Sequence, residues 1–194
     1  MKYLSVFTSD SEILQAFSDI FLKGNWYDAD ITYSKGVFYY DIEQPKEKYD
    51  LIPLSADVIE QDSQVLDRML DNSYTSIIFD PPFLFRNRKS DNNDKMCNRF
   101  SYFKSYEELI KMYSNTLKAV YKKLQKGGYL FFKCQDMTDG KFYCSHYKII
   151  KIANEIGYIL KDIGIKISKS KLQRDAKQQN CLAKTHSYWL VFKK

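Results

Sequence analysis

The 194-residue sequence has few of the residues that mark metal-binding and disulfide-stabilised proteins. It holds two histidines, His146 and His186, and four cysteines, none of which forms a Cys-x-x-Cys pair. This spacing fits zinc-ligand patterns poorly and gives no disulfide framework. The sequence therefore predicts no metal site, and it predicts reduced thiols, as in the cytoplasm.

Glycine and proline are also scarce, with seven and four residues, and long hydrophobic runs are lacking. Asp10 and Glu12 interrupt the first apolar stretch, which excludes a signal peptide or a spanning helix there. What is present is 44% apolar and 16% aromatic residues, enough for the core of one ordinary domain. We expect one globular, cytoplasmic domain over residues 1–194, without membrane association.

Charge is distributed unevenly along the chain, although the net charge is only +6. Residues 1–80 hold 6 Lys and Arg against 15 Asp and Glu, whereas residues 81–194 hold 24 against 9. The basic part would attract a polyanion such as nucleic acid. Lysine-rich surface filler, which solubilises many domains, is the competing interpretation.

Apolar periodicity predicts helices and strands in alternation. Helices are expected over residues 9–22, 105–126 and 145–156, with an amphipathic segment at 65–70 and with Gly127-Gly128 ending the second helix. Strands are expected over residues 28–33, 48–53, 58–62, 76–80, 129–133, 158–168 and 187–192. This alternation is typical of a three-layer α/β/α sandwich with a mostly parallel sheet.

The strand at residues 76–79 ends abruptly in Asp80-Pro81-Pro82-Phe83. Pro81 cannot donate to a sheet ladder and holds Asp80 extended, so the Asp80 carboxylate and the Pro81 carbonyl can aim at one point. That point lies where open α/β sheets bind ligands. Two fixed acceptors beside an aromatic ring suit the exocyclic amino group of a nucleobase, although a plain turn after a buried strand is the alternative.

Two further segments suggest nucleotide contacts. The strand that begins at Asp28 runs into a turn with Ser34 and Gly36, small residues that let backbone N–H groups approach a ligand; a hairpin turn would look the same. Asp50, in the second predicted strand, could accept hydrogen bonds from a ribose diol, or it could be a solvent-facing loop residue.

Two long connections are basic. Residues 84–104 interleave basic residues with aromatic ones, a combination suited to phosphate contact and base stacking, and disorder is the competing interpretation. Residues 169–184 form the second basic connection. Substrate contacts are expected at Arg86, Arg88, Lys89, Lys133 and Arg174.

Asp80-Pro81-Pro82-Phe83 after an apolar strand resembles the catalytic motif of S-adenosylmethionine-dependent amino-methyltransferases, and its Asp form is similar to the N6-adenine DNA enzymes. Residues 48–53 resemble the second-strand acidic motif of this family, and residues 30–36 resemble its first-strand cofactor loop. Asp62 lies where such enzymes keep the acid that meets the cofactor adenine. Residues 128–136 and 186–192 look like small methylases from phages and mobile elements.

This resemblance implies a Rossmann-like methyltransferase fold with an antiparallel C-terminal strand, S-adenosylmethionine as cofactor, and direct methyl transfer to the N6 amino group of adenine in DNA. Asp80, Pro81, Pro82 and Phe83 would be catalytic. The cofactor would contact Asp30, Thr32, Ser34, Gly36, Asp50 and Asp62.

The sequence departs from the family pattern in the cofactor loop, where Ser34 replaces the first of two usual glycines. Between Gly36 and Asp50, a gap that contains Pro45, there is little room for the usual helix. An RNA-base or protein-glutamine methyltransferase and a non-catalytic nucleic-acid-binding subunit therefore stay open. Target specificity is either low, or resides in the basic connections, or comes from a partner subunit or homodimer.

Overall fold

The computed structural model describes residues 3–85, 103–168 and 181–194. Eight strands form one sheet in the order β1-β9-β10-β6-β5-β2-β3-β4. Their bounds are β1 (Val6–Phe7), β2 (Ala29–Asp30), β3 (Glu47–Asp50), β4 (Ile59–Glu60), β5 (Tyr74–Phe79), β6 (Leu124–Cys134), β9 (Ile159–Ile167) and β10 (His186–Lys193). A separate hairpin pairs β7 (Met137–Asp139) with β8 (Lys141–Tyr143).

Strands β4, β3, β2, β5 and β6 run parallel to one another. Strand β10 lies antiparallel between β6 and β9, and β1 adds to β9 in parallel. The expected mostly parallel sheet with an antiparallel C-terminal strand is confirmed. Because the chain leaves β2 toward β3 and leaves β5 toward β6, β2 and β5 mark the topological switch point, where open sheets bind ligands.

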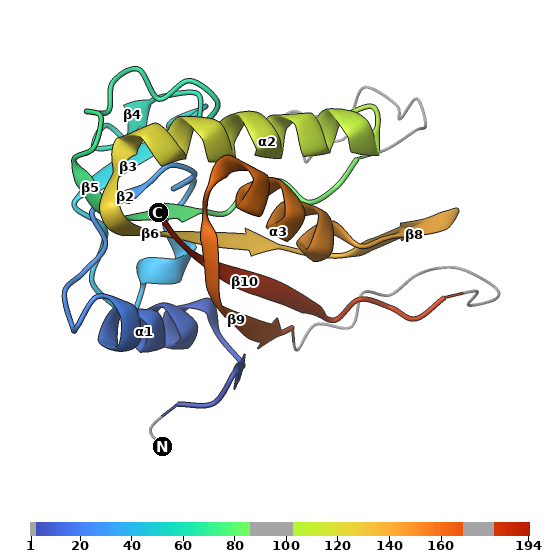
Figure 1. Cartoon of the computed structure of the whole chain (residues 1–194). Helices are drawn as coiled ribbons and strands as arrows, with labels where there is room; N and C mark the ends of the chain where they lie inside the picture. Colours follow the sequence, from blue (N-terminus) through green and yellow to red (C-terminus); the bar gives the residue numbers. More distant parts are fainter. Residues whose placement is uncertain (1–2, 86–102, 169–180) are drawn as a thin grey trace.

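Helices cover both faces of the sheet (Figure 1). Helices α2 (Tyr106–Lys123) and α3 (Ser145–Ile156) pack on one face, and α1 (Asp10–Phe21) with the short helix η1 (Val37–Tyr39) packs on the other. Successive residues of β5 point to opposite faces, so Ile77 and Phe79 join the α2–α3 core while Ile78 joins the α1 core. None of the described helices has the length and apolar character needed to cross a bilayer.

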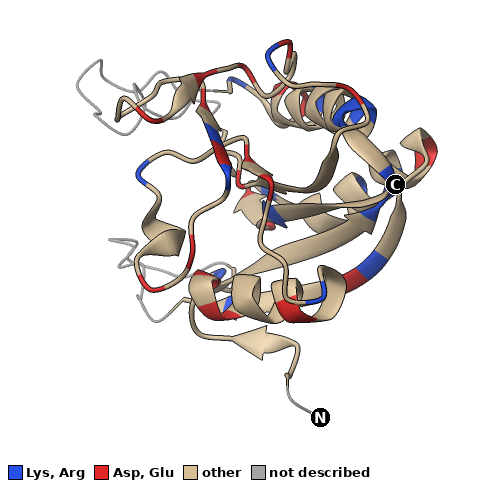
Figure 2. Cartoon of the chain, turned by 90° about the vertical axis from the view of Figure 1, so that its left-hand side faces the viewer, with Lys and Arg blue, Asp and Glu red and all other residues tan. Residues whose placement is uncertain are grey.

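The expected helix signals are present. Ser9 and Glu12 form a capping box at the start of α1, and the Ser105 side chain caps α2. Gly157 ends α3 with a φ of 119°. Lys122 and Lys123 lie in the last turn of α2, where their charges complement the helix dipole. Figure 2 shows basic positions near the C-terminus of the chain.

The prediction that Gly127-Gly128 ends the second helix is wrong. Helix α2 ends at Lys123, and β6 begins directly at Leu124, which pairs with Tyr74 of β5. The glycines lie inside β6, where Gly127 N–H donates to the carbonyl of Lys194. Pairing with distant parts of the chain therefore starts β6 earlier than the apolar pattern at residues 129–133 predicts.

The amphipathic segment at residues 65–70 forms turns rather than a helix. Leu66 has a φ of 53°, which a helix cannot contain, yet the Leu66 and Met69 side chains are buried in the α2–α3 core. Val65 and Leu70, the other two apolar residues of the segment, are exposed, so the segment has one buried and one exposed side.

Candidate active site at the carboxyl edge of the sheet

A cavity of about 490 Å³ opens beyond the carboxyl ends of β2, β3, β4 and β5. Its lining comes from residues 31–34, 37–38, 50–52, 61–64 and 79–82, together with Leu54, Phe103 and Met112. The volume lies within the range of about 300–1,000 Å³ that is usual for small-molecule sites. The segments that follow these four strands are far apart in sequence, and they converge where the switch point predicts a ligand.

Asp80 follows β5 at the wall of this cavity. Its backbone N–H donates to Thr32 Oγ1 at 2.7 Å, and its side chain is 23% exposed. Oxygen Oδ1 is buried and has no hydrogen-bond partner among the described residues. Burial raises the pKa of Asp80 to about 6, against the opposing charge of Lys133, whose Nζ lies 3.7 Å from Oδ2. An unpaired buried acceptor is costly, so this oxygen is suited to a donor supplied by a ligand.

The two prolines and the phenylalanine hold the corner that follows. Pro81 is buried, and Pro82 and Phe83 are half-buried. The hydroxyl of Tyr113, a buried residue of α2, donates to the Pro82 carbonyl at 2.6 Å. Pro81 and Pro82 line the cavity, whereas Phe83 lies outside its lining.

Asp30 lies behind the cavity wall rather than on it, with 1% of its surface exposed. Its carboxylate accepts hydrogen bonds from the Thr32 N–H at 2.8 Å and from the Tyr39 hydroxyl at 2.7 Å. Burial raises the pKa of Asp30 to about 7, although both of these bonds oppose the shift. Asp30 thus positions Thr32, which in turn holds the backbone of Asp80.

The loop after β2 adopts a left-handed backbone conformation at two positions, although it contains only one glycine. Ser34 has a φ of 52°, in the region that glycine favours, and Gly36 has a φ of 64°. The Ser34 N–H donates to Asp50 Oδ2 at 2.8 Å, which ties this loop to the end of β3. The expected lack of room for a full helix is confirmed, because only the three-residue η1 follows Gly36.

Gly36→Ala tests the packing of this loop. An added Cβ would clash with Tyr33 Oη, and the alanine would have to adopt an unfavourable φ of 64°. We expect a loss of about 2–4 kcal/mol in the free energy of unfolding, from left-handed strain and displacement of the Tyr33 ring. Urea unfolding measures it.

Gly24→Ala is the matched control, because Gly24 has a φ of 80° and nothing within 4 Å of an added Cβ. It should lose only the strain component, about 1–2 kcal/mol. Equal losses in the two variants would contradict the close contact with Tyr33.

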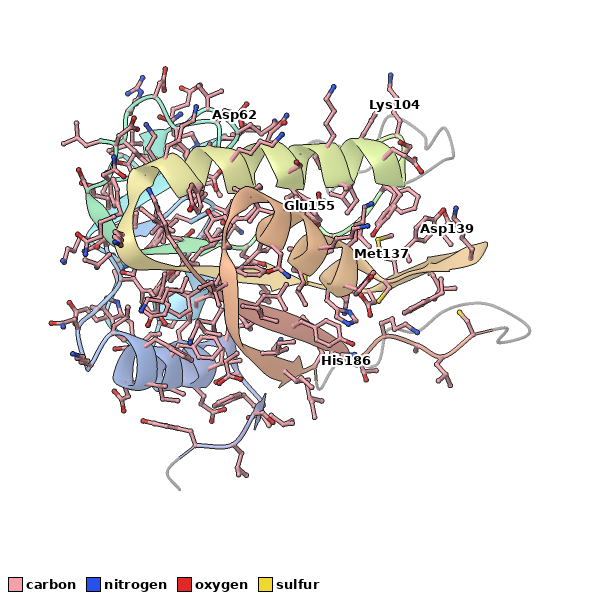
Figure 3. The ribbon with its side chains drawn as sticks, in the orientation of Figure 1. Asp62, Lys104, Met137, Asp139, Glu155 and His186 are labelled. Atoms are coloured by element: carbon pink, nitrogen blue, oxygen red, sulfur yellow. The ribbon has the colours of Figure 1, made fainter. Side chains whose placement is uncertain are left out.

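Two further carboxylates, Asp50 and Asp62, line the cavity at the ends of β3 and β4. Asp50 Oδ1 accepts from the Ile52 N–H at 2.9 Å, and Asp62 Oδ1 accepts from the Gln64 N–H at 2.8 Å. The segment after Asp62 lies against α2, where Asn115 bonds Gln64 Oε1 at 3.1 Å (Figure 3). Both acids are thereby fixed by backbone groups and keep acceptor capacity for a ligand.

Lys133 comes from β6 and points toward Asp80. Its Nζ lies 3.0 Å from Asp10 Oδ1 and 4.4 Å from the centre of the Phe38 ring, and the residue is 7% exposed. Asp10 also accepts from Trp189 Nε1 at 2.9 Å. The sequence assigned Lys133 to substrate contact; the structure places its charge inside the protein, next to the candidate catalytic carboxylate.

Sequence reasoning missed Asp10, Tyr39 and Tyr113 as parts of the site. Asp10 carried only a helix-start signal, and the two tyrosines have the pattern of core residues. The other expected substrate contacts, Arg86, Arg88, Lys89 and Arg174, lie outside the described residues and remain predictions.

Lys133→Met should shift the acid limb of the pH–rate profile. The Lys133 charge lowers the pKa of Asp80, so its removal raises that pKa and protonates Asp80 at higher pH. If the carboxylate form is the active one, the acid limb of kcat/KM moves to higher pH, starting from a wild-type position near 6.

Lys166→Met is the control for this profile. Lys166 Nζ lies 3.6 Å from Asp10 Oδ2, and its charge has a smaller lowering effect on the pKa of Asp80. It should cause a smaller shift in the same direction. An acid limb that Lys133→Met leaves in place would show that Asp80 ionisation does not control the rate.

Comparison with known proteins gives structural neighbours but no sequence relatives. No protein-family model and no curated protein matches the chain. The cytosine-N4-specific PvuII DNA methyltransferase matches at a TM-score of 0.52 and 18% identity, over 69% of this chain and 47% of that one. A candidate exported protein from Bordetella parapertussis matches at a TM-score of 0.52 and 8% identity, over 95% of this chain and 65% of that one. An S-adenosylmethionine-dependent methyltransferase from Archaeoglobus fulgidus matches at a TM-score of 0.49 and 14% identity, over 95% of this chain and 94% of that one.

These likenesses concern the fold. With the strand order and the antiparallel β10, the likeness to the PvuII enzyme defines the fold as the Rossmann-like methyltransferase type. The chain spans about half the length of the DNA methylases that it matches, which include PvuII methyltransferase and a Thermus thermophilus protein assigned as a DNA modification methylase.

Proposed function

We propose that this protein is a S-adenosylmethionine-dependent methyltransferase that acts on the amino group of a nucleobase in DNA, with the N6 amino group of adenine as the first candidate. The observation that carries the proposal is the buried Asp80 Oδ1 at the wall of a cavity at the switch point, an oxygen without a hydrogen-bond partner in the part of the chain that the structure describes. This acceptor lies beyond the carboxyl end of β5, at the edge where open α/β sheets bind their ligands.

The cavity lining fits the cofactor. Leu51, Ile52 and Leu54 are each about half exposed and line the cavity, so a flat apolar adenine would cover them. Asp50 lies beside them with a fixed carboxylate that can accept from a ribose diol, and Asp62 can accept from the adenine amino group. When bound, S-adenosylmethionine supplies an electrophilic methyl group on a sulfonium.

Asp80 would act on the target nitrogen. Its Oδ1 accepts one amino N–H, which draws electron density onto a nitrogen whose lone pair is otherwise shared with the ring. That nitrogen could accept the methyl group that a bound cofactor would supply, with the thioether as leaving group, and it would then release one proton to solvent. Thr32 and Tyr113 hold the two sides of the corner, so the acceptor needs no reorganisation.

Adenine in DNA is the first candidate because the Asp form of the motif resembles the adenine enzymes. The PvuII neighbour, which is cytosine-N4-specific, supports an exocyclic amino group as the target and leaves the base to experiment. Either base would have to leave its duplex to reach Asp80, at a cost of a few kcal/mol. The basic connections that include Arg86, Arg88, Lys89 and Arg174 would offset that cost through phosphate contacts.

Two measurements test the proposal. Calorimetry with S-adenosylmethionine should give one binding site, and an absence of binding would favour a non-catalytic nucleic-acid-binding subunit. Transfer of a labelled methyl group should favour duplex DNA over RNA and over protein extract. Label that appears only in RNA or in protein would establish methyl transfer and overturn the DNA assignment.

A further inference from the structure

The hairpin of β7 and β8 brings together three side chains that the methyltransferase account does not use. Its register pairs Met137 with Tyr143 and Asp139 with Lys141, so the next residues outward, Asp136 and Cys144, face each other at its base. Cys144 is also the residue at the N-cap position of α3, whose first turn carries His146. One ligand atom each from Asp136, Cys144 and His146 lies within 4.8 Å of the others.

The distances suit a shared ion. His146 Nδ1 lies 2.9 Å from both carboxylate oxygens of Asp136, and Cys144 Sγ lies 3.7 Å from the same nitrogen. In a tetrahedral zinc site with bonds of about 2.0–2.3 Å, ligand atoms lie about 3.3–3.7 Å apart. The sulfur already has this spacing from His146 Nδ1 and lies within 4.8 Å of an Asp136 oxygen, and the Asp136–His146 pair would open by a few tenths of an ångström.

The surroundings hold these ligands in place. Asp136 is 4% exposed, and its Oδ1 also accepts from the backbone N–H of His146 at 3.2 Å. The Tyr188 ring lies 4.3 Å from the His146 ring, and the Tyr188 hydroxyl lies 3.0 Å from His186 Nε2. Figure 3 shows Met137, Asp139 and His186 at this same end of the molecule. Such neighbours fix the orientation of an imidazole, as metal sites require.

We propose that Asp136, Cys144 and His146 bind one divalent transition-metal ion of the zinc class. Oxygen, nitrogen and sulfur donors together favour zinc over magnesium or calcium, and three protein ligands leave one coordination position for water. Binding would release the Cys144 thiol proton to solvent, because the thiolate is the ligand. The three residues lie outside the cavity lining, so the ion would tie the hairpin to α3 rather than take part in methyl transfer.

This site revises the expectation of no metal that the cysteine spacing gave. Asp136 and Cys144 are eight positions apart, and only the hairpin register brings them to one point. The alternative is a metal-free cap, in which Asp136 bonds the ring and backbone of His146 and the thiol is a bystander. The metal site and the metal-free cap differ in one bond, because only the metal site joins the Cys144 sulfur to an ion.

Cobalt(II) titration of the full chain distinguishes them. A Cys97→Ser/Cys181→Ser background leaves Cys134 and Cys144 as the two thiols of the chain. We expect one equivalent of cobalt to bind with a thiolate-to-cobalt charge-transfer band in the near ultraviolet, and zinc to displace it. Cys144→Ser should remove the band and weaken binding at least about tenfold, and His146→Ala should weaken binding as much.

His186→Ala is the matched control, since this imidazole contacts Tyr188 but lies outside the ligand set. It should keep the band. Absence of a charge-transfer band in the unsubstituted cluster would overturn the proposal without any need for a ligand variant. A band that survives in Cys144→Ser would also overturn it, because the sulfur would then be Cys134.

Discussion

Asp80→Ala is expected to lower methyl transfer by about 10²–10³-fold, the loss that follows removal of one preorganised hydrogen-bonding group from a reacting centre. Affinity for S-adenosylmethionine should stay close to that of the wild type, because Asp80 is assigned to the substrate amino group. Labelled-methyl transfer at saturating cofactor measures the first quantity, and calorimetry measures the second. Transfer within about tenfold of wild type would remove Asp80 from the catalytic role.

Two control variants sharpen this result. Asp80→Asn keeps the shape of the side chain and one carbonyl acceptor but loses the charge, so its activity should fall between those of wild type and Asp80→Ala. Asp162→Ala removes an exposed carboxylate from β9, outside the cavity lining, and should leave transfer unchanged. Equal losses in Asp80→Asn and Asp80→Ala would assign the effect to charge rather than to the acceptor.

Asp50→Ala should have the largest effect on cofactor affinity. It removes the acceptor proposed for the ribose diol and releases the Ser34 and Ile52 N–H groups that shape the cavity edge. We expect S-adenosylmethionine binding to weaken by about 1–3 kcal/mol, the usual cost of deleting one partner of a buried polar contact. This loss is about 5–150-fold in the dissociation constant, which calorimetry can resolve.

Asp57→Ala is the matched control for Asp50. Asp57 is an exposed acid on the connection between β3 and β4, paired with Lys48 and outside the cavity lining. Its removal should leave cofactor affinity unchanged. If Asp50→Ala binds normally while Asp62→Ala binds weakly, the ribose assignment at the end of β3 is wrong and the acid after β4 is the main cofactor contact.

Local signals were sufficient for the parts of the fold that are locally determined. The apolar run before Asp80 gave a buried central strand, Ser9 and Ser105 gave helix starts, and Gly157 gave a helix end. The alternation of elements was enough to give the layer architecture, because parallel neighbours need crossover connections. Switch-point geometry then brings residues after four strands to one cavity.

Contacts between distant segments could not be predicted. Asp10 contacts Lys133 and Trp189 because α1 packs across β6 and β10. In the sequence, Asp10 is an ordinary acid at a helix start, and the other two are ordinary strand residues. Gly127 and Gly128 join a strand because the backbone of Lys194 supplies a hydrogen-bond partner for each of them. Ser34 takes a left-handed conformation because Asp50 bonds its N–H, whereas residue type alone favours glycine there.

The identity of the methylated nucleoside tests the central claim most directly. Duplex DNA incubated with the protein and labelled S-adenosylmethionine would be digested to nucleosides and separated by chromatography, with Asp80→Ala in parallel. We predict label in N6-methyladenine with the wild type and almost none with the variant. Label in N4-methylcytosine would keep the amino-methyltransferase and change its base. The absence of label from DNA, RNA and protein alike, with a protein that binds the cofactor, would contradict the account.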